Sequence, residues 1–418
     1  MAYDEITALL GGWPGFAIRS VTREPGGTRT GAPQITIELE AMAAATRYCS
    51  RCGRVTREVH DTALRRVREL PILDAETWLV VPLARVACAT CGPTVEGLPW
   101  LDRYARMTKR FAESVARLAH VLPIKQVAEW FGLSWDTVQA IDEAALEARL
   151  GPVTLDGLKQ IVIDEFAIQK GHRYATVVAQ PQTREVLWVG RGRKREDLRP
   201  FFELLGPDRC AALQAAVMDM SEAYELETRA HCPQITIVFD LFHVVAKFGR
   251  EVIDRVRVDA TNRIARAAGP NDQRTRRARR VIKGARWLLL RNKANLPRKD
   301  RVRLKELLAL NRPLYVVYVL KDELKSIWSY RYTAVALRAW NAWYGWAIRS
   351  RIPALVTFAR NLKAKLPGIL AHCRFPLHTG VLEGMNNKIK VLKRMAYGYR
   401  NDAYFFLKIR AAFPGNPR

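Results

Sequence analysis

The chain has 418 residues, which is enough for two or three hydrophobic cores. Hydrophobic residues make up 49% and charged residues 26%, as in ordinary folded proteins. Lysine and arginine total 68 against 41 acidic residues, a net charge of +27 with a pI near 10.2. No apolar run approaches the ~20 residues that span a bilayer, and we expect no signal peptide. The positive charge therefore favours nucleic acid over a membrane as the partner.

Composition and hydrophobic period divide the chain into six expected segments, and together they predict a multidomain α+β protein. The period is two residues where strands are expected and 3.6 where helices are expected. In chain order we expect an N-terminal lead-in (1–45), a cysteine module (46–100), a helical segment that binds DNA (101–155), the first part of an α/β domain (156–245), a basic all-helical insertion (246–372) and the C-terminal part of the α/β domain (373–418).

The N-terminal segments predict a few strands followed by helices. In the otherwise loose lead-in, Gln34–Leu39 alternates Ile with Thr and Glu, which is typical of a strand. Residues 78–83 predict a second strand inside the cysteine module. Residues 105–150 have a helical period that Pro123 and Gly132 interrupt.

From about Leu158 the pattern predicts strands that alternate with helices. The expected elements are strands at 160–164, 173–180, 185–190, 212–219 and 235–240, and helices at 195–205 and 222–230. Their order, β-β-β-α-β-α-β, is that of the ribonuclease H fold. Residues 241–370 are helical in pattern, and residues 382–409 predict a helix, a short break and a second helix.

The insertion contains the most basic stretch of the chain. Residues 271–310 hold 14 lysines and arginines against 3 acidic residues. Within it, the charge run 274–280 is either a solvated helix face or a surface that contacts DNA. The candidate contacts are Arg276, Arg277, Arg279 and Arg280.

Four of the seven cysteines form two Cys-x-x-Cys pairs, Cys49 with Cys52 and Cys88 with Cys91. Each pair places two thiolates on one side of a tight turn, and two such turns close a tetrahedral structural zinc site. The 35 residues between the pairs must fold into structure of their own. Redox-active thiols or cysteines without a shared function are the alternatives, and His60 is expected to be a surface residue rather than a ligand.

Residues 124–141 resemble a helix-turn-helix. Gly132 would allow the turn, and Ser134 would cap the second helix. Lys125, Ser134 and Thr137 are the candidate DNA contacts. An ordinary helical hairpin is the alternative, and the basic character of the chain favours DNA binding.

Three aspartates stand at the ends of expected strands, namely Asp164, Asp219 and Asp240. A carboxylate at the end of a buried strand is costly unless it is paired or binds a metal. In a ribonuclease H fold the first and fourth strands are neighbours, so their acids would converge. Glu383, on a late helix, would complete a site for two magnesium ions.

These motifs, in this order, resemble the ISL-three family of insertion-sequence transposases over residues 45–410. The matching pieces are the two cysteine pairs, the helix-turn-helix, Ile163–Phe166 with Lys170–Tyr174, Met218–Ser221 with Tyr224, Phe239–Val244, Glu383–Lys390 and Lys393–Arg400. Two positions depart from the family pattern, Leu241 and Thr379, and neither is a carboxylate.

The resemblance implies an enzyme of the DDE type. Such an enzyme binds the terminal inverted repeats of its element as double-stranded DNA, cleaves a strand and joins the new 3′ hydroxyl to target DNA. It implies two Mg²⁺ per active site, for which Mn²⁺ can substitute, and structural Zn²⁺. We expect a dimer on DNA, in the bacterial cytoplasm and associated with the nucleoid. The alternatives are a non-catalytic DNA-binding regulator derived from a transposase and a nuclease without strand transfer.

The resemblance also assigns residues. Asp164 and Glu383 carry over as magnesium ligands, whereas the middle acid is either Asp219 or Asp240. The strand order favours Asp219, so that Asp240 and His243 form an accessory Asp-x-x-His motif. Basic residues near the last motif are further candidate DNA contacts, namely Lys388, Lys390, Lys393 and Arg394.

One aromatic stripe has two interpretations. Trp340, Trp343 and Trp346 lie three residues apart on an expected helix. They would either stack on a DNA base or pack in a helical core, and we favour the core.

Overall fold

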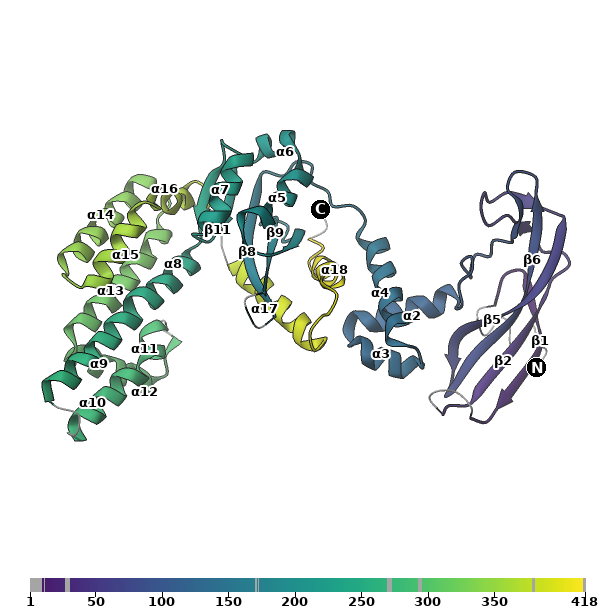
Figure 1. Ribbon diagram of the computed structural model, residues 1–418, viewed down its shortest axis with the longest axis horizontal. Coiled ribbons are helices and arrows are strands. Elements are labelled where there is room, and N and C mark those ends of the chain that lie inside the picture. Colours follow the sequence, from purple (N-terminus) through teal and green to yellow (C-terminus); the bar gives the residue numbers. More distant parts are fainter. Residues whose placement is uncertain are drawn as a thin grey trace. The chain divides into compact units, whose positions relative to one another are not determined.

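The computed structural model describes residues 10, 12–26, 31–169, 171, 173–268, 273–291, 295–377 and 380–415, with the backbone alone for a few helical residues that include Arg277 and Glu383. The chain forms two compact units (Figure 1). The first contains Met1–Gly151 and Lys393–Leu407, and the second contains Pro152–Leu392 and Lys408–Arg418.

The first unit begins with a twisted sheet in the order β1-β2-β6-β5, with β7 pairing β6. The strands are β1 (Phe16–Glu24), β2 (Gln34–Ala41), β5 (Val59–Ile72), β6 (Ala75–Cys88) and β7 (Gly92–Val95). β2 pairs β6 in parallel, and β1 pairs β2 antiparallel. The expectation of a loose lead-in at 1–45 is therefore wrong, because both of its strands belong to the sheet.

A second, smaller group of elements in this unit is the helix-turn-helix. It consists of α2 (Lys109–Val121), α3 (Ile124–Phe131) and α4 (Trp135–Leu150). Gly132 ends α3 at φ 64°, where a side chain would be strained. Ser134 caps α4 by accepting a hydrogen bond from the backbone N–H of Thr137. The predicted turn and cap are both confirmed.

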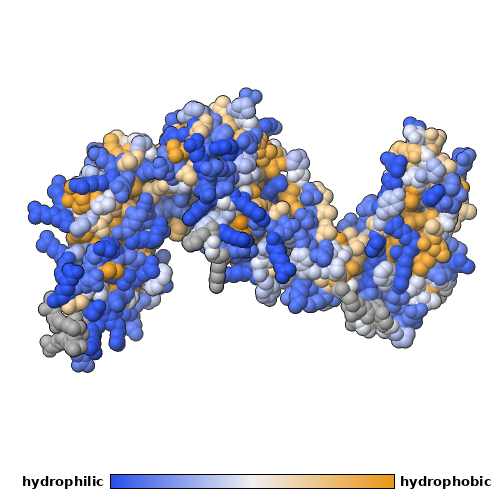
Figure 2. All heavy atoms as spheres, viewed as in Figure 1, coloured by the Kyte–Doolittle hydropathy of each residue, from blue (hydrophilic) through white to orange (hydrophobic). Residues whose placement is uncertain are grey.

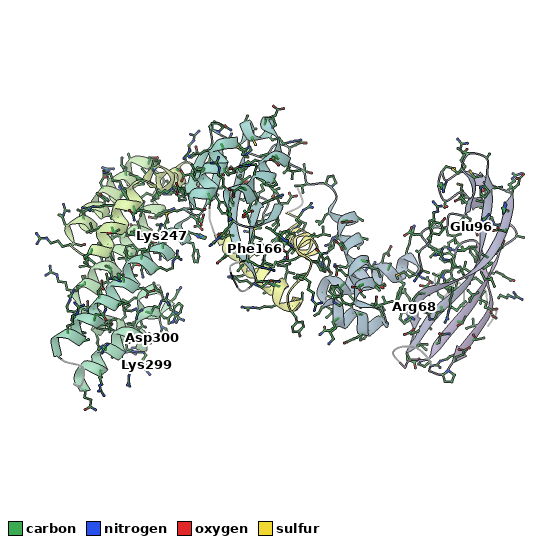
Figure 3. All side chains as sticks on the ribbon, viewed as in Figure 1. Arg68, Glu96, Phe166, Lys247, Lys299 and Asp300 are labelled. Carbon is green, nitrogen blue, oxygen red and sulfur yellow. The ribbon has the colours of Figure 1, made fainter. Side chains whose placement is uncertain are left out.

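Arg68, labelled in Figure 3, connects the sheet to these helices. It is 5% exposed, forms an ion pair with Glu76 and donates from Nη2 to the backbone oxygen of Phe131 at 3.0 Å. Because an unpaired guanidinium this deep would be costly, the contact fixes β5 against α3.

The second unit is built on a mixed sheet in the order β10-β9-β8-β11-β12. Its strands are β8 (Gln160–Gln169), β9 (Arg173–Ala179), β10 (Val186–Arg191), β11 (Ala215–Met218) and β12 (Thr236–Phe239). β8, β9 and β10 pair antiparallel, whereas β8, β11 and β12 pair in parallel. Every strand expected in this region is present, and β8 and β11 are adjacent as predicted.

Helices between the strands complete this core. They are α5 (Arg195–Leu205), α6 (Pro207–Ala212) and α7 (Glu222–His231). The face of α5 that carries Leu198, Phe201, Phe202 and Leu205 is buried, as its spacing predicts. α6 was not predicted, because its six residues are too short for a helical period.

Between β12 and Cys373 the regular elements in the described part of the chain are helices. The elements are α8 (Leu241–Phe248), the π-helix η1 (Gly249–Ile253), α9 (Asp254–Ala268), α10 (Gln273–Gly284), α11 (Arg286–Leu290), α12 (Arg298–Leu310), α13 (Arg312–Ser326), η3 (Ile327–Ser329), α14 (Thr333–Arg349), α15 (Pro353–Lys363), α16 (Leu366–Leu370) and η4 (Ala371–Cys373). Figure 2 shows hydrophilic side chains over most of the visible face of α9 to α12. Among the described residues, no helix is both long and apolar enough to cross a membrane.

The tryptophan stripe lies on α14. Trp340 and Trp343 are each 1% exposed, and Trp343 Nε1 donates to the backbone oxygen of Leu320 at 2.8 Å. For these two residues the interpretation as helical core is confirmed. Trp346 is half exposed and lies outside that core.

The last two helices are α17 (Gly380–Met395) and α18 (Asp402–Ala412), which confirms the predicted helix, break and helix. α17 starts in the second unit and ends in the first, and α18 returns to the second. Tyr404 is buried and donates its hydroxyl hydrogen to Asp142 on α4. The expected segment 373–418 is therefore divided, because Lys393–Leu407 packs with the helix-turn-helix.

Candidate active site and metal centre

The four paired cysteines converge beside β6. Cys49 and Cys52 lie in the turn between the short strands β3 (Arg47–Tyr48) and β4 (Val55–Thr56), and Cys88 and Cys91 lie at the turn from β6 to β7. Their sulfur atoms all lie within 4.8 Å of one another. Zinc bonded to four sulfurs at ~2.3 Å would hold them ~3.8 Å apart, so this arrangement fits zinc.

Backbone hydrogen bonds favour the thiolate form in this cluster. Backbone N–H groups of Cys52 and Arg51 donate to Cys49 Sγ and lower the pKa of that thiol to about 6, although burial opposes the shift. The glycines after each pair, Gly53 and Gly92, both have φ 70°, which makes these tight turns possible. A thiolate is the form that binds zinc, and four of them leave no open position for chemistry.

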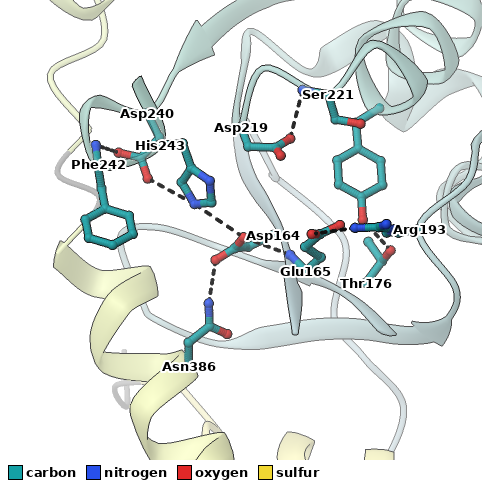
Figure 4. A network of polar contacts seen from close by, with 11 residues as sticks. Asp164, Glu165, Thr176, Arg193, Asp219, Ser221, Asp240, Phe242, His243 and Asn386 are labelled. Atoms are coloured by element: carbon teal, nitrogen blue, oxygen red, sulfur yellow. Dashed lines mark hydrogen bonds and ion pairs between the residues drawn. The ribbon is translucent and has the colours of Figure 1, made fainter. Parts of the chain in front are cut away.

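The acidic cluster forms at one edge of the second sheet (Figure 4). Asp164 lies in the middle of β8 rather than at its end, which corrects the expectation. Asp219 directly follows β11, and Asp240 follows β12 and caps α8. Because β8, β11 and β12 are parallel neighbours, the three aspartates come to the same edge.

Asp164 is the centre of the contacts in this cluster. Its Oδ1 accepts from the backbone N–H of Glu165 at 2.8 Å, and its Oδ2 accepts from Nδ2 of Asn386 at 2.6 Å. The Nε2 atom of His243 lies 3.7 Å from Asp164 Oδ1 and 3.7 Å from Asp240 Oδ2. The sequence places His243 and Asp240 in one motif, and the structure brings that motif to Asp164.

The other acids are held by their own backbone. Asp219 Oδ1 accepts from the N–H of Ser221 at 3.0 Å, and Asp240 Oδ1 accepts from the N–H of Phe242 at 2.8 Å. Glu383 lies on α17 three residues before Asn386. Its side chain lies outside the described residues.

Sequence reasoning gave no role to Asn386, although it lies in the motif that contains Glu383. Its Oδ1 atom is buried and has no hydrogen-bond partner among the described residues. A buried carbonyl oxygen without a donor, next to a buried carboxylate, fits a position for a hard cation.

Electrostatics support the same interpretation. Burial raises the pKa of Asp164 to about 6, and the nearby charge of Asp219 adds to the shift, whereas His243 and two hydrogen bonds oppose it. The ionised carboxylate is therefore unfavourable in the metal-free protein. A divalent cation would reverse that penalty, which makes the cluster fit magnesium or a similar ion.

This penalty predicts how stability depends on pH. In the metal-free protein we expect stability to rise as the pH falls from above 6 toward 3.8, because the folded state then binds a proton at Asp164 that the unfolded state does not. Asp164→Asn should remove this slope and stabilise the metal-free protein at pH 7 by roughly 1–3 kcal/mol. Saturating Mg²⁺ should raise the melting temperature of the unaltered protein and not of the variant. Thermal unfolding at several pH values checks both, and equal slopes for the two proteins would contradict it.

Comparisons with known proteins agree with this geometry. A model described as "Transposase", of the DDE type, matches residues 161–409. A "Helix-turn-helix domain of transposase family ISL3" matches residues 96–146. The "zinc-finger of transposase IS204/IS1001/IS1096/IS1165" matches residues 45–91. The class that the sheet, the acids and these matches define is a DDE-type transposase.

Two curated relatives cover nearly the whole chain. The transposase for insertion sequence element IS1001 of Bordetella parapertussis is 51% identical over 412 residues, 98% of each chain. The transposase for IS1557 of Mycobacterium tuberculosis is 32% identical over 413 residues, 94% of this chain and 91% of the relative. The chain therefore belongs to the ISL3 family of insertion-sequence transposases, as the motifs predicted.

Most of the candidate DNA contacts lie on helices α3, α4, α10 and α17. Lys125 is exposed beside Glu129, and the hydroxyls of Ser134 and Thr137 are 2.7 Å apart at the start of α4. Lys388 donates to the backbone oxygen of Ala412 at 2.6 Å and thus ties α17 to the end of α18. Other candidates lie on helices, with Arg276 and Arg280 exposed, Arg279 half-buried, Lys390 and Arg394 exposed and Lys393 half-buried; the side chain of Arg277 lies outside the described residues.

Proposed function

We propose that this transposase binds the terminal inverted repeats of its element, cleaves a DNA strand there and transfers the new 3′ end to target DNA. The observation that carries the proposal is the convergence of Asp164, Asp219 and the Asp240–His243 motif at one sheet edge, with α17 alongside. The strand order β10-β9-β8-β11-β12 supports a ribonuclease H-like catalytic domain, which the helices between β12 and α17 interrupt as an insertion.

We assign the carboxylates by their positions. Asp164 comes from the central strand and would contact two ions, whereas Asp219 and Glu383 would each hold one. Asp219 is favoured over Asp240 because β11 pairs directly with β8, while β12 does not. When bound, Mg²⁺, or Mn²⁺ in its place, supplies an activated attacking oxygen and stabilises the leaving oxygen. His243 lies between Asp240 and Asp164, with its Nε2 atom 3.7 Å from an oxygen of each, and Asn386 orients Asp164.

DNA recognition is assigned to the first unit. We propose that the four-cysteine zinc site fixes one end of its sheet and that α4 enters the major groove from its N-terminus. The end-bound protein is proposed to act as a dimer on double-stranded DNA.

A strand-transfer assay tests the proposed function. The purified protein is incubated with a duplex that carries one inverted repeat from the DNA flanking the gene, with a target plasmid, in Mg²⁺ or in EDTA. Joined product in Mg²⁺ alone supports the proposal. Specific binding without any cleavage would instead indicate a non-catalytic regulator, and cleavage without joining would indicate a nuclease.

The basic helix α10 gives a separate prediction. If Arg276 and Arg280 contact phosphates, replacing both by glutamine should weaken binding to all DNA sequences alike. The slope of log affinity against log salt should become shallower by up to ~1.8, since each lost phosphate contact contributes ~0.9. Salt titrations of binding measure this slope. The matched control is the double variant Arg338→Gln and Arg360→Gln, whose arginines are exposed on α14 and α15. Identical slopes for the two double variants would mean that the arginines of α10 contact solvent rather than DNA.

A further inference from the structure

A pocket of about 310 Å³ opens directly beside the acidic cluster. Asp219 and His243 lie on its wall, so the pocket continues the candidate active site. Glu165, Met220 and Ser221 also line it, together with three cations, namely Arg193, Lys247 and Arg250. None of these three cations lies in a motif identified in the sequence.

Two of the cations belong to a stripe along one helix. His243, Lys247 and Arg250 are spaced by four and three residues, which places them on one face of the continuous helix formed by α8 and η1. Figure 3 labels Lys247 on this helix. Lys247 has a loose ion pair with Glu251 at 3.9 Å, and no acid in the described part of the chain forms an ion pair with Arg250.

The helix takes a wide π turn where the stripe ends. π turns are rare and occur often at functional sites. Gly249 begins this turn, and a Cβ atom there would lie 2.7 Å from Cδ2 of Leu290. The close approach of α11 therefore fixes the helix at the level of Arg250.

Arg193 lines the same pocket from the loop between β10 and α5, and the contacts of that loop fix its backbone. Gly192 has φ 86°, and a Cβ on it would collide with the carboxylate of Asp197, which accepts from the N–H of Lys194 at 2.8 Å. The guanidinium of Arg193 lies 4.0 Å from the ring centre of Tyr174 and 3.2 Å from Glu165 Oε1. Arg193 is thus held in place, and Figure 4 shows it beside Glu165.

We propose that Arg193, Lys247 and Arg250 form a subsite for phosphate groups of the cleaved DNA strand, next to the bond that is cut. The inference rests on the proposed function and adds the residues that place the strand against the carboxylates. Fixed cations lower the cost of bringing a phosphodiester to a cluster of negative charge. Arginine donates to a phosphate through two N–H groups, which also sets its orientation.

The lining favours phosphate over a flipped base. A base would need an aromatic or broad apolar surface for stacking. Of the side chains that line this pocket, Met220 is the one apolar group and the ring of His243 is the one aromatic group, and the rest are charged or polar. The space corresponds to roughly ten water molecules, enough for a hydrated phosphodiester.

The test pairs protein charges with single phosphates. A neutral methylphosphonate is moved one position at a time along the cleaved strand of an inverted-repeat duplex, and single-turnover cleavage is measured in Mg²⁺. We expect one or two positions beside the cut to slow the unaltered protein about tenfold. Arg250→Gln or Lys247→Gln should cleave unmodified DNA about tenfold more slowly. Each variant should lose no further rate when the methylphosphonate replaces the phosphate that the altered residue contacts. Arg250→Lys, which keeps the charge, should recover most of the rate.

The exposed Arg338→Gln variant is the control and should reproduce the pattern of the unaltered protein. If the rate loss from the substitution and the rate loss from the methylphosphonate multiply at every DNA position, the proposed subsite is wrong. The same scan is repeated by measuring equilibrium binding in EDTA. There too, each variant should be insensitive to the methylphosphonate at the phosphate that its altered residue contacts. An unaltered protein that cuts no DNA would refute the proposed function alone, whereas cleavage with no pairing in either scan would refute the subsite alone.

Discussion

Asp164→Asn, Asp219→Asn and Glu383→Gln are each expected to reduce strand cleavage and joining by at least ~10³-fold, which corresponds to an increase of about 4 kcal/mol in the activation barrier. Each change keeps the size of the side chain and removes the charge that holds a cation. Binding to the inverted repeat should change little, because we assign that binding to the first unit. Asp240→Asn should cost only ~10-fold, since Asp240 is assigned to support.

The measurement is the cleavage rate beside gel-shift affinity for all four variants. Asp156→Asn, which removes an exposed acid paired with Arg209, is the control and should cut normally. If Asp219→Asn retains activity while Asp240→Asn is inactive, the middle acid is Asp240. In that case β12 rather than β11 supplies the second ligand.

Cys88→Ser is expected to abolish zinc binding and, with it, specific binding to the inverted repeat. Four thiolates within 4.8 Å form one site, and the binding energy of a structural zinc, ~10–16 kcal/mol, is part of the folding energy of its module. The second unit has its own core and should unfold at an unchanged temperature. Metal analysis, gel shifts and thermal unfolding measure the three effects.

Cys373→Ser is the matched control, because Cys373 lies in the second unit at the end of η4. It should retain one zinc per chain and normal binding. Freshly purified unaltered protein without zinc would contradict the assignment, as would specific binding by the zinc-free Cys88→Ser variant.

Features with a local cause could be predicted from the sequence. The turn at Gly132 and the cap at Ser134 depend on residues within a few positions, and both are present. The buried face of α5 likewise follows from spacing alone. The lead-in was misjudged because only the first residues of β1, Phe16 and Ile18, are buried, and because β2 pairs in parallel with β6, some 40 residues later.

The site was predicted only as far as its motifs reach. Asp164 was expected at a strand end, because the apolar run at 160–164 ends there, yet β9 continues to pair β8 beyond it and the carboxylate is buried. The compensation comes from Asn386, 222 positions away, which no local pattern could reveal. The position of Arg193 could not be predicted either. It depends on the neighbouring Gly192, which has no side chain to collide with the carboxylate of Asp197.

The shared helix α17 means that neither unit is continuous along the chain. Residues 1–151 alone lack Lys393–Leu407 and thus the hydrogen bond from Tyr404 to the buried Asp142. A fragment that stops there would expose the face that α18 covers, so a separately expressed DNA-binding part requires the C-terminal segment as well. During synthesis, the first unit is complete only after residue 407 has emerged. A nascent or prematurely ended chain therefore lacks the contact of α18 with α4, and both units become complete only when the C-terminal segment has been made.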